Sequence, residues 1–231
     1  MKIIKIEDVG EVELRKSKRA KRLIIKIDQV GKPIVTVPSY VPFVVAEQFV
    51  LKQKKWLLEH ANKKQPLVLF EGKRIGKIHT IHFIKKAVIK PTSRILNDKI
   101  VINYPEFLTP ISTLVQEEAK KACKRALKKQ AELYLPGMLH QAAKKYGFTY
   151  SEVRIKTVKT RWGSCSSNRI INLSIWLMQL PQDLIEYVIF HELCHLKHMN
   201  HSKQFWTELE RMVPAYKHLK KQLKEYSPTL I

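Results

Sequence analysis

Short alternations of apolar and polar residues fill the first hundred positions of the chain. Segments rich in β-branched residues, separated by turn residues, predict strands at residues 23–28, 33–38, 66–70, 79–83 and 99–103. One stretch with helical spacing, residues 44–61, interrupts them and carries Phe49, Trp56 and Leu57. This part of the chain is therefore expected to be rich in β-structure.

The pattern changes after Pro105 and Pro110, which mark a junction. Apolar residues then recur at helical spacing from about residue 114 to residue 146, where Pro136-Gly137 should break or kink the helix. Further along, the pattern predicts strands at residues 153–158 and 169–176 and helices at residues 205–213 and 215–226. This order favours an α+β fold with a β-rich basic N-terminal region, residues 1–105, followed by a second domain, residues 106–231.

Between these segments lies a helix whose apolar face carries polar residues. Pro181 opens this helix, and Asp183 and Glu186 lie in its positive first turn. One stripe at helical spacing contains Leu184, Val188, His191 and His195, and the stripe beside it contains Ile185, Ile189, Glu192 and Leu196. We therefore expect the two histidines and the glutamate to be buried.

The run His191-Glu192-Leu193-Cys194-His195 has the HExxH spacing of zinc hydrolases. Residues four apart share one helix face, so both imidazoles can reach a single ion. Glu192 lies about 100° around the helix and can hold a metal-bound water without binding the metal itself. Zinc lowers the pKa of such a water to about 7, so a carboxylate can take its proton at neutral pH. The alternative is a helix with hydrogen-bonded core histidines, which does not explain a buried free carboxylate.

A catalytic zinc site needs a third protein ligand. His198 continues the helix face but lies about 10 Å along a straight axis from His191, which fits one ion poorly. Glu208 and Glu210 could act from the next helix. His201 is favoured, because Asn200 tolerates the left-handed conformation that ends helices and His201 could then turn back toward the ion.

Charge adds a second signal. The chain has 43 Lys and Arg against 20 Asp and Glu, a net charge of +23, and such a field favours polyanions, chiefly nucleic acid. The cations concentrate at residues 15–22 and 120–129, where they also suit a charged sheet edge and the solvated face of a helix. No base-reading motif accompanies them.

Composition also bears on the compartment. The first residues contain no apolar core long enough for a signal peptide, and no run approaches the ~18 apolar residues of a membrane span. Three scattered cysteines, Cys123, Cys165 and Cys194, suit a reducing environment. The expected location is cytoplasmic, without membrane contact.

Three motifs together resemble a known family. His191 to His195, the run from Asn200 to Trp206 (NHSKQFW) and the run from Arg161 to Ser166 (RWGSCS) are similar to the YgjP-like metallopeptidases, bacterial and archaeal zincins related to SprT-type proteases. The similarity is strongest from about residue 154 to residue 212, with a weaker echo at residues 17–23 and around Trp56. The resemblance implies a zincin-like catalytic domain, a small sheet plus the HExxH helix, with His191, His195 and His201 as metal ligands and Glu192 as catalytic acid and base.

In zincins generally, the strand before the active-site helix is a sheet edge that binds an extended peptide as a further strand. Residues 169–176 would be that strand here, with substrate contacts around Asn172 and Ser174. Arg161, Tyr187 and His198 are candidates for stabilising the oxyanion.

The sequence thus predicts a zinc metalloendopeptidase that hydrolyses peptide bonds through a Glu-activated, zinc-bound water. Its partners would be peptide or protein substrates, and the SprT-like kinship suggests proteins associated with nucleic acid. The alternative is a zinc-stabilised basic module that binds nucleic acid with little or no hydrolysis. No residue pattern specifies the oligomeric state.

Overall fold

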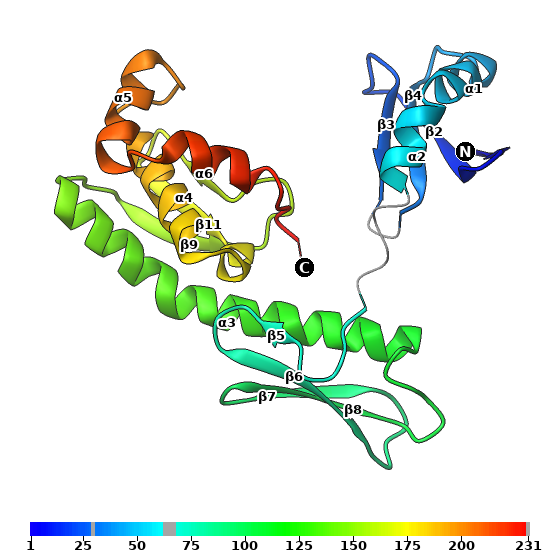
Figure 1. Ribbon diagram of the computed structural model, residues 1–231, viewed down its shortest axis with the longest axis horizontal. Helices are drawn as coiled ribbons and strands as arrows, with labels where there is room; N and C mark the ends of the chain where they lie inside the picture. Colours follow the sequence, from blue (N-terminus) through cyan, green and yellow to red (C-terminus); the bar gives the residue numbers. More distant parts are fainter. Residues whose placement is uncertain (29–30, 62–67, 230–231) are drawn as a thin grey trace. The chain divides into compact units, whose positions relative to one another are not determined.

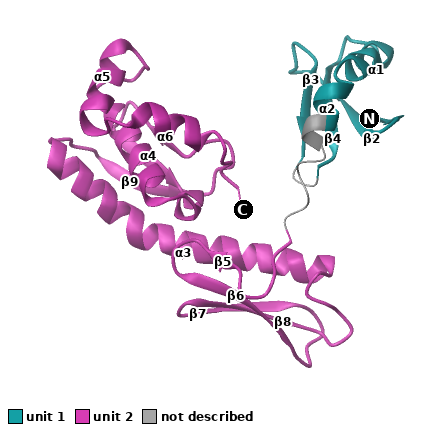
Figure 2. Cartoon of the chain, viewed as in Figure 1, with its two compact units in different colours: residues 1–67 teal, residues 68–231 magenta. Residues whose placement is uncertain are grey.

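A computed structural model describes residues 1–28, 31–61 and 68–229 and divides the chain into two compact units, residues 1–67 and 68–231 (Figures 1 and 2). This boundary lies earlier in the chain than the predicted junction at residue 105. The reason is a tertiary contact, because the strands between residues 68 and 105 pack on a helix that begins only at Thr113. The pattern of apolar and polar residues along the sequence does not reveal such a contact.

Unit 1 is a four-stranded sheet with two helices. Its strands are β1 (Lys2–Ile6), β2 (Gly10–Ser17), β3 (Ile24–Ile27) and β4 (Pro33–Pro38), in the order β1-β2-β4-β3, and its helices are α1 (Phe43–Lys52) and α2 (Lys54–Ala61). Strands β2 and β4 are parallel, and the other pairs are antiparallel. The core combines the inward residues of β2 and β4, such as Leu14 and Val35, with Ala46, Val50 and Leu57 of the helices.

Unit 2 is built along α3 (Thr113–Tyr146). A second four-stranded sheet, in the order β5-β6-β8-β7, packs on this helix (Figure 1) and comprises β5 (Arg74–Ile75), β6 (His79–Lys85), β7 (Thr92–Leu96) and β8 (Lys99–Tyr104). Of the predicted break or kink at Pro136-Gly137, the break is wrong, since α3 continues through Pro136. Proline removes one backbone hydrogen bond, and the buried residues Ala131, Leu135 and Leu139 hold the helix together on either side.

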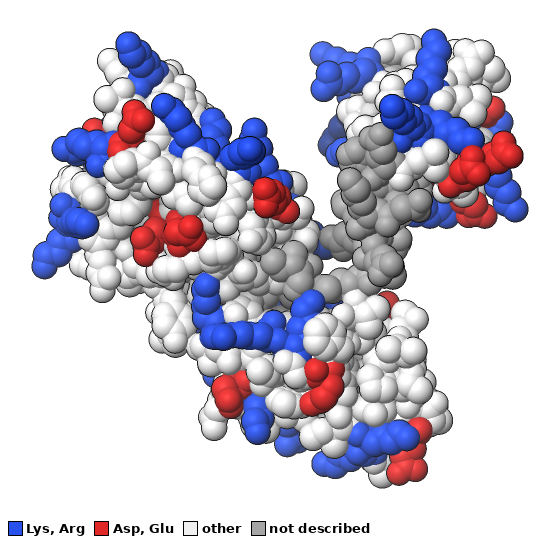
Figure 3. Space-filling view, viewed as in Figure 1, with Lys and Arg blue, Asp and Glu red and all other residues white. Residues whose placement is uncertain are grey.

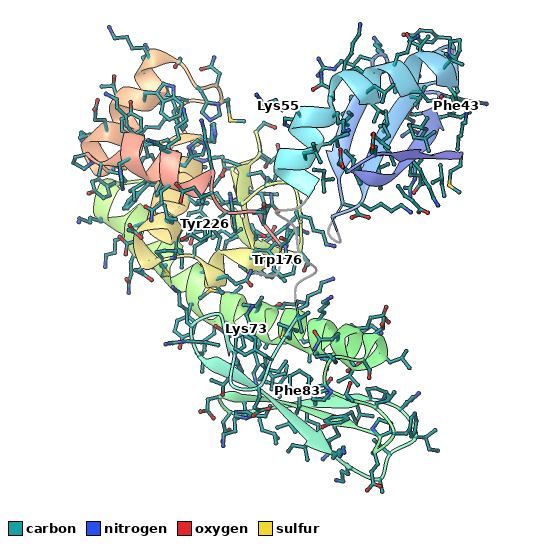
Figure 4. All side chains as sticks on the ribbon, turned by 45° about the vertical axis from the view of Figure 1, so that its right-hand side comes forward. Phe43, Lys55, Lys73, Phe83, Trp176 and Tyr226 are labelled. Carbon is teal, nitrogen blue, oxygen red and sulfur yellow. The ribbon has the colours of Figure 1, made fainter. Side chains whose placement is uncertain are left out.

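The remaining elements of unit 2 include the helix that carries HExxH and the segments around it, and several of them contact α3. They are β9 (Glu152–Lys156), β10 (Gly163–Cys165), β11 (Ile170–Ser174), the 3₁₀ helix η1 (Ile175–Gln179), α4 (Gln182–Cys194), α5 (Lys203–Met212) and α6 (Tyr216–Leu223). The strands form a small sheet in the order β10-β11-β9. Trp176 of η1, labelled in Figure 4, is buried where η1 meets α3.

The predicted α+β class is confirmed. Several elements differ in detail. The helix predicted at residues 44–61 is interrupted at Gln53, and of the strand predicted at residues 66–70 the described residues 68–70 are not β-structure, while residues 66 and 67 lie outside the described part. The three cysteines are free thiols. No helix of the described residues has both the length and the apolar character needed to cross a bilayer.

Candidate metal centre and active site

Helix α4, which carries the HExxH residues, contacts both α3 and the small sheet. Leu184, Ile185, Val188, Ile189 and Glu192 are buried, as the apolar stripes predict. His191 and His195 were also expected to be buried but are only half-buried. The helix ends at Cys194, however, with His195 as its C-cap, so the predicted continuation to about Asn200 is wrong. Asn200 is also not in the left-handed conformation. The chain instead turns at once through backbone hydrogen bonds from Leu196 to Leu193 and from His198 to Cys194.

This early end brings His201 back to the helix. The Nε2 atoms of His191 and His201 lie 3.1 Å apart, and one ring nitrogen from each of His191, His195 and His201 falls within 4.8 Å of the others. Two nitrogens on a tetrahedral zinc ion with bonds of about 2.05 Å lie about 3.3 Å apart. The side chain of Ser202 accepts a hydrogen bond from Phe205 N and caps α5 immediately after His201.

Surrounding groups orient the rings. His195 Nδ1 donates to the carbonyl of His198 at 3.0 Å, which leaves Nε2 free to face the other histidines. The indole Nε1 of Trp206 donates to the carbonyl of His201 at 3.0 Å, and the two rings stack at 5.4 Å and 23°. Phe205, fully buried, contacts all three imidazoles. Phe205 and Trp206 belong to the NHSKQFW motif, but the motif alone does not indicate that they contact the histidine rings.

The pKa values of His191 and His201 suit these residues to bind a metal cation. Burial and the neighbouring imidazoles His195 and His201 lower the pKa of His191 to about 3, and burial also lowers the pKa of His201. These two rings are therefore neutral at physiological pH and keep the lone pair that a metal ion requires. Three imidazole nitrogens that converge in this way are a ligand set typical of zinc.

Glu192 lies beside the triad and is 5% exposed. Burial raises its pKa to about 8, and the positive charge of Arg161 opposes this shift. Its Oε2 atom is buried and has no hydrogen-bond partner among the described residues. A buried carboxylate oxygen without a partner is costly, and a polar ligand in the adjoining cleft would remove that cost.

The other candidate ligands lie elsewhere. Glu208 pairs with Lys197 at 2.8 Å and with Arg211 at 3.2 Å. Glu210 pairs with Lys217 at 3.6 Å. Neither carboxylate belongs to the cluster of three histidines, which is the group of metal-ligating side chains found in the described part of the chain.

The triad and Glu192 open into a cleft of about 540 Å³. Its opposite wall is β10 with the preceding loop, from Thr160 and Arg161 to Gly163, Ser164 and Cys165. Tyr187 and His198 do not line it. Burial raises the pKa of the Cys165 thiol to about 11, so this group is protonated at neutral pH and is a poor nucleophile.

The predicted edge strand is wrong. β11 is the central strand, paired with β10 on one side and β9 on the other. Asn172 and Ser174 therefore lie behind β10, where Asn172 Nδ2 donates to Ser164 Oγ and both residues line a small hollow of about 20 Å³ outside the cleft. The residues of one strand do not specify which neighbours it will pair with.

β10 is the edge strand of this sheet that lines the cleft. Trp162 O accepts from Ser174 N, and Ser166 N donates to Ile170 O, so alternate residues of this strand bond to β11. In an antiparallel ladder the residues between them direct N–H and C=O groups to the other side. Gly163 and Cys165 thus turn their backbone groups away from β11, and both residues line the cleft.

Two imidazoles at the end of α4 and a third from the segment before α5 converge beside a buried carboxylate. This arrangement, facing a short sheet edge, has the features of a metal-dependent hydrolase. The chain matches the family described as "YgjP-like, metallopeptidase domain" over residues 21–226. It belongs to this family and is a metallopeptidase, for which protein or peptide substrates and a bound metal ion are implied.

Solved structures add two similarities. The zymogen of abylysin from Pyrococcus abyssi is 27% identical, with a TM-score of 0.36, and the match covers 39% of this chain and 92% of that one. The zymogen of jannalysin from Methanocaldococcus jannaschii is 21% identical, also with a TM-score of 0.36, and the match covers 39% and 93%. Both are described as metallopeptidases. No protein with a curated description matches the chain.

Proposed function

We propose that the protein is a zinc-dependent endopeptidase in which His191, His195 and His201 hold the metal ion and Glu192 transfers protons. The observation that carries this proposal is the convergence of three imidazole nitrogens beside a buried carboxylate. When bound there, zinc would supply a Lewis acid and lower the pKa of a coordinated water to about 7.

Glu192 has the environment of an acid–base group. Its carboxylate takes a proton from the water that attacks the scissile carbonyl carbon, and passes this proton to the nitrogen as the C–N bond breaks. A pKa raised toward neutrality by burial supports both steps, because the group then accepts and releases a proton within the same pH range.

The edge of β10 is the proposed substrate site. The outward N–H and C=O groups of Gly163 and Cys165 offer an extended peptide the bonds of an added strand. Such binding recognises the peptide backbone, and the open cleft lets the chain continue in both directions, which favours internal cleavage. β10 thereby replaces the β11 residues Asn172 and Ser174 in the proposed substrate site.

Arg161 is the proposed oxyanion group. Of the three candidates from the sequence, Tyr187 is buried outside the cleft and His198 turns its carbonyl to His195, whereas the exposed Arg161 lines the cleft and acts electrostatically on Glu192. Its guanidinium can therefore meet negative charge that develops on the scissile carbonyl.

The test measures zinc content by mass spectrometry. It also measures cleavage of an unfolded protein such as casein that carries self-quenched fluorophores, whose fluorescence rises on cleavage. Wild-type protein should hold about one zinc per chain, and Glu192→Gln should keep the zinc but lose hydrolysis by several orders of magnitude. His201→Ala should lose most of the metal, whereas the matched variant His198→Ala keeps it, because only the His198 carbonyl contacts a ligand. Unchanged cleavage by Glu192→Gln would refute this role.

The high positive charge favours a second candidate, a zinc-stabilised module that binds nucleic acid without hydrolysis. A structural zinc site is normally closed by four protein ligands and has no use for a buried free carboxylate. This candidate therefore predicts no hydrolysis by the zinc-loaded wild-type protein. Cleavage together with nucleic-acid binding would instead support a peptidase acting on proteins associated with nucleic acid.

A further inference from the structure

Two loops of unit 1 meet at one end of its sheet. Because β2 and β4 are parallel, with Ser17 opposite Pro38, the segments that follow them leave the sheet side by side. A backbone hydrogen bond from Ser39 N to Ser17 O continues the pairing beyond the strands. The second loop, residues 39–42, is held in place by Lys16, whose ammonium donates to the carbonyls of Pro38, Ser39 and Val41.

The first loop, residues 18–22, is strongly basic, and we call it the basic loop. Its cations are Lys18, Arg19, Lys21 and Arg22, and all four are exposed. None of them forms an ion pair with a carboxylate among the described residues. Elsewhere in unit 1, Arg15 pairs with Glu13, and Lys32 pairs with Glu11 at the opposite end of the sheet. Lys and Arg side chains are visible at this end of unit 1 in Figure 3. Four cations without partners are available to an anionic ligand.

The second loop presents an aromatic ring beside them. Tyr40 is 73% exposed, and its hydroxyl donates to the carbonyl of Lys21 at 3.0 Å. The ring is thus tied to the basic loop while most of its surface faces solvent. α1 begins directly after this loop, at Phe43, which is labelled in Figure 4, and the Lys16 ammonium lies 5.0 Å from the Phe43 ring centroid.

We propose that this end of unit 1 binds single-stranded nucleic acid, with phosphates on the basic loop and a base stacked on Tyr40. Cations alone would attract any polyanion. An exposed aromatic ring among them can also stack against an unpaired base, which single-stranded nucleic acid provides. The paired bases of a duplex offer no such face. The proposal concerns unit 1 and does not rest on the peptidase function.

The test is fluorescence anisotropy of the full-length protein with a labelled single-stranded oligonucleotide of about 20 nucleotides over a range of salt concentrations. One variant replaces Lys18, Arg19, Lys21 and Arg22 by alanine. The charge-matched control replaces Lys121, Lys124, Lys128 and Lys129 of α3, which are exposed on unit 2 and tolerate alanine in a helix.

Both variants lose four positive charges, so a general field effect is the same for each. We expect the loop variant to reduce the slope of log K against log salt by about 3, and the control to change it much less. Tyr40→Ala should weaken binding about tenfold. Tyr40→Phe, which keeps the ring but loses the bond to Lys21, should bind more tightly than Tyr40→Ala.

Equal losses in the loop variant and the α3 control would overturn the proposal, since binding would then follow net charge alone. Wild-type affinity in Tyr40→Ala would show that no base stacks on Tyr40. Loop-dependent binding to phosphatidylserine vesicles without binding to the oligonucleotide would assign the surface to a membrane instead. Circular dichroism of each variant verifies that unit 1 is folded, and replacing the four cations by glutamine provides a second variant.

Discussion

The conformation of Glu192 depends on the smallest residue of the opposite wall. A Cβ atom built on Gly163 would lie 2.6 Å from Glu192 Oε1, 2.7 Å from its Cγ and 2.8 Å from its Cδ. These distances are far below contact, so the carboxylate packs directly against the backbone of β10. Glycine here leaves the room that the Glu192 side chain occupies, and thereby fixes the carboxylate relative to the strand edge.

Gly163→Ala should therefore impair catalysis without removing the metal. The added methyl group must displace the carboxylate, and a shift of about 1 Å in a catalytic group costs about 100-fold in rate. Peptide hydrolysis and zinc content of the same preparation check this. Gly137→Ala is the control, because a Cβ at that helical position meets nothing within 4 Å and the rate should not change. Wild-type activity in Gly163→Ala would show that Glu192 does not need its observed position.

The elements of the site show what the sequence could predict. The two apolar stripes predicted α4 and the burial of Glu192, since helical spacing is a local property. The end of α4 at Cys194 was missed, because the sequence between residues 194 and 200 contains no Gly or Pro that would mark it, and the chain turns there through backbone hydrogen bonds. The central place of β11 was missed for a different reason, because strand pairing is a contact between distant segments.

A buried polar contact joins α3 to the second sheet. Gln130 of α3 donates to His79 Nδ1 at 2.7 Å and to Ile75 O at 3.0 Å, and its Oε1 accepts from Lys77 N. His79 is 3% exposed, and burial lowers its pKa. Accepting a bond at Nδ1 requires an uncharged ring in one tautomer, so the join between helix and sheet depends on a neutral His79.

Acid should therefore weaken unit 2 through His79. The unfolded chain binds a proton at His79 near pH 6.5 and the folded chain only at lower pH, so the contribution is complete above about pH 6.5 and is lost as the pH falls toward the folded pKa. Urea unfolding between about pH 7.5 and about pH 5.5 should show a shallower pH dependence in His79→Gln than in wild type. His140→Gln, at an exposed position of α3, should follow wild type. Parallel curves for His79→Gln and wild type would contradict this.

At the scale of the whole molecule, each unit has a core of its own. The eight core residues of unit 1 all lie before residue 58, and the three histidines of the proposed metal site all lie in unit 2. A unit of about 67 residues is large enough to fold alone but is only marginally stable. Metal binding should therefore stabilise one unit and leave the other unchanged.

Calorimetry of the intact chain should show two transitions, of which one moves with zinc. Free zinc at about 100 times its dissociation constant adds about 2.7 kcal/mol to the unit that binds it, and a chelator removes this gain. His201→Ala should abolish the shift and preserve the transition of unit 1. A single transition that moves as one with zinc would contradict the independence of the two units.

The shortness of β10 limits how tightly the proposed substrate site can hold a peptide. Three residues, with backbone groups of only Gly163 and Cys165 facing outward, offer a few hydrogen bonds worth about 1 kcal/mol each. Backbone pairing alone then corresponds to dissociation constants of about a millimolar or weaker. A second attachment of the target raises its effective concentration at the cleft to about the millimolar range. The rate of cleavage would then depend more on how the target is tethered than on which residues surround its scissile bond.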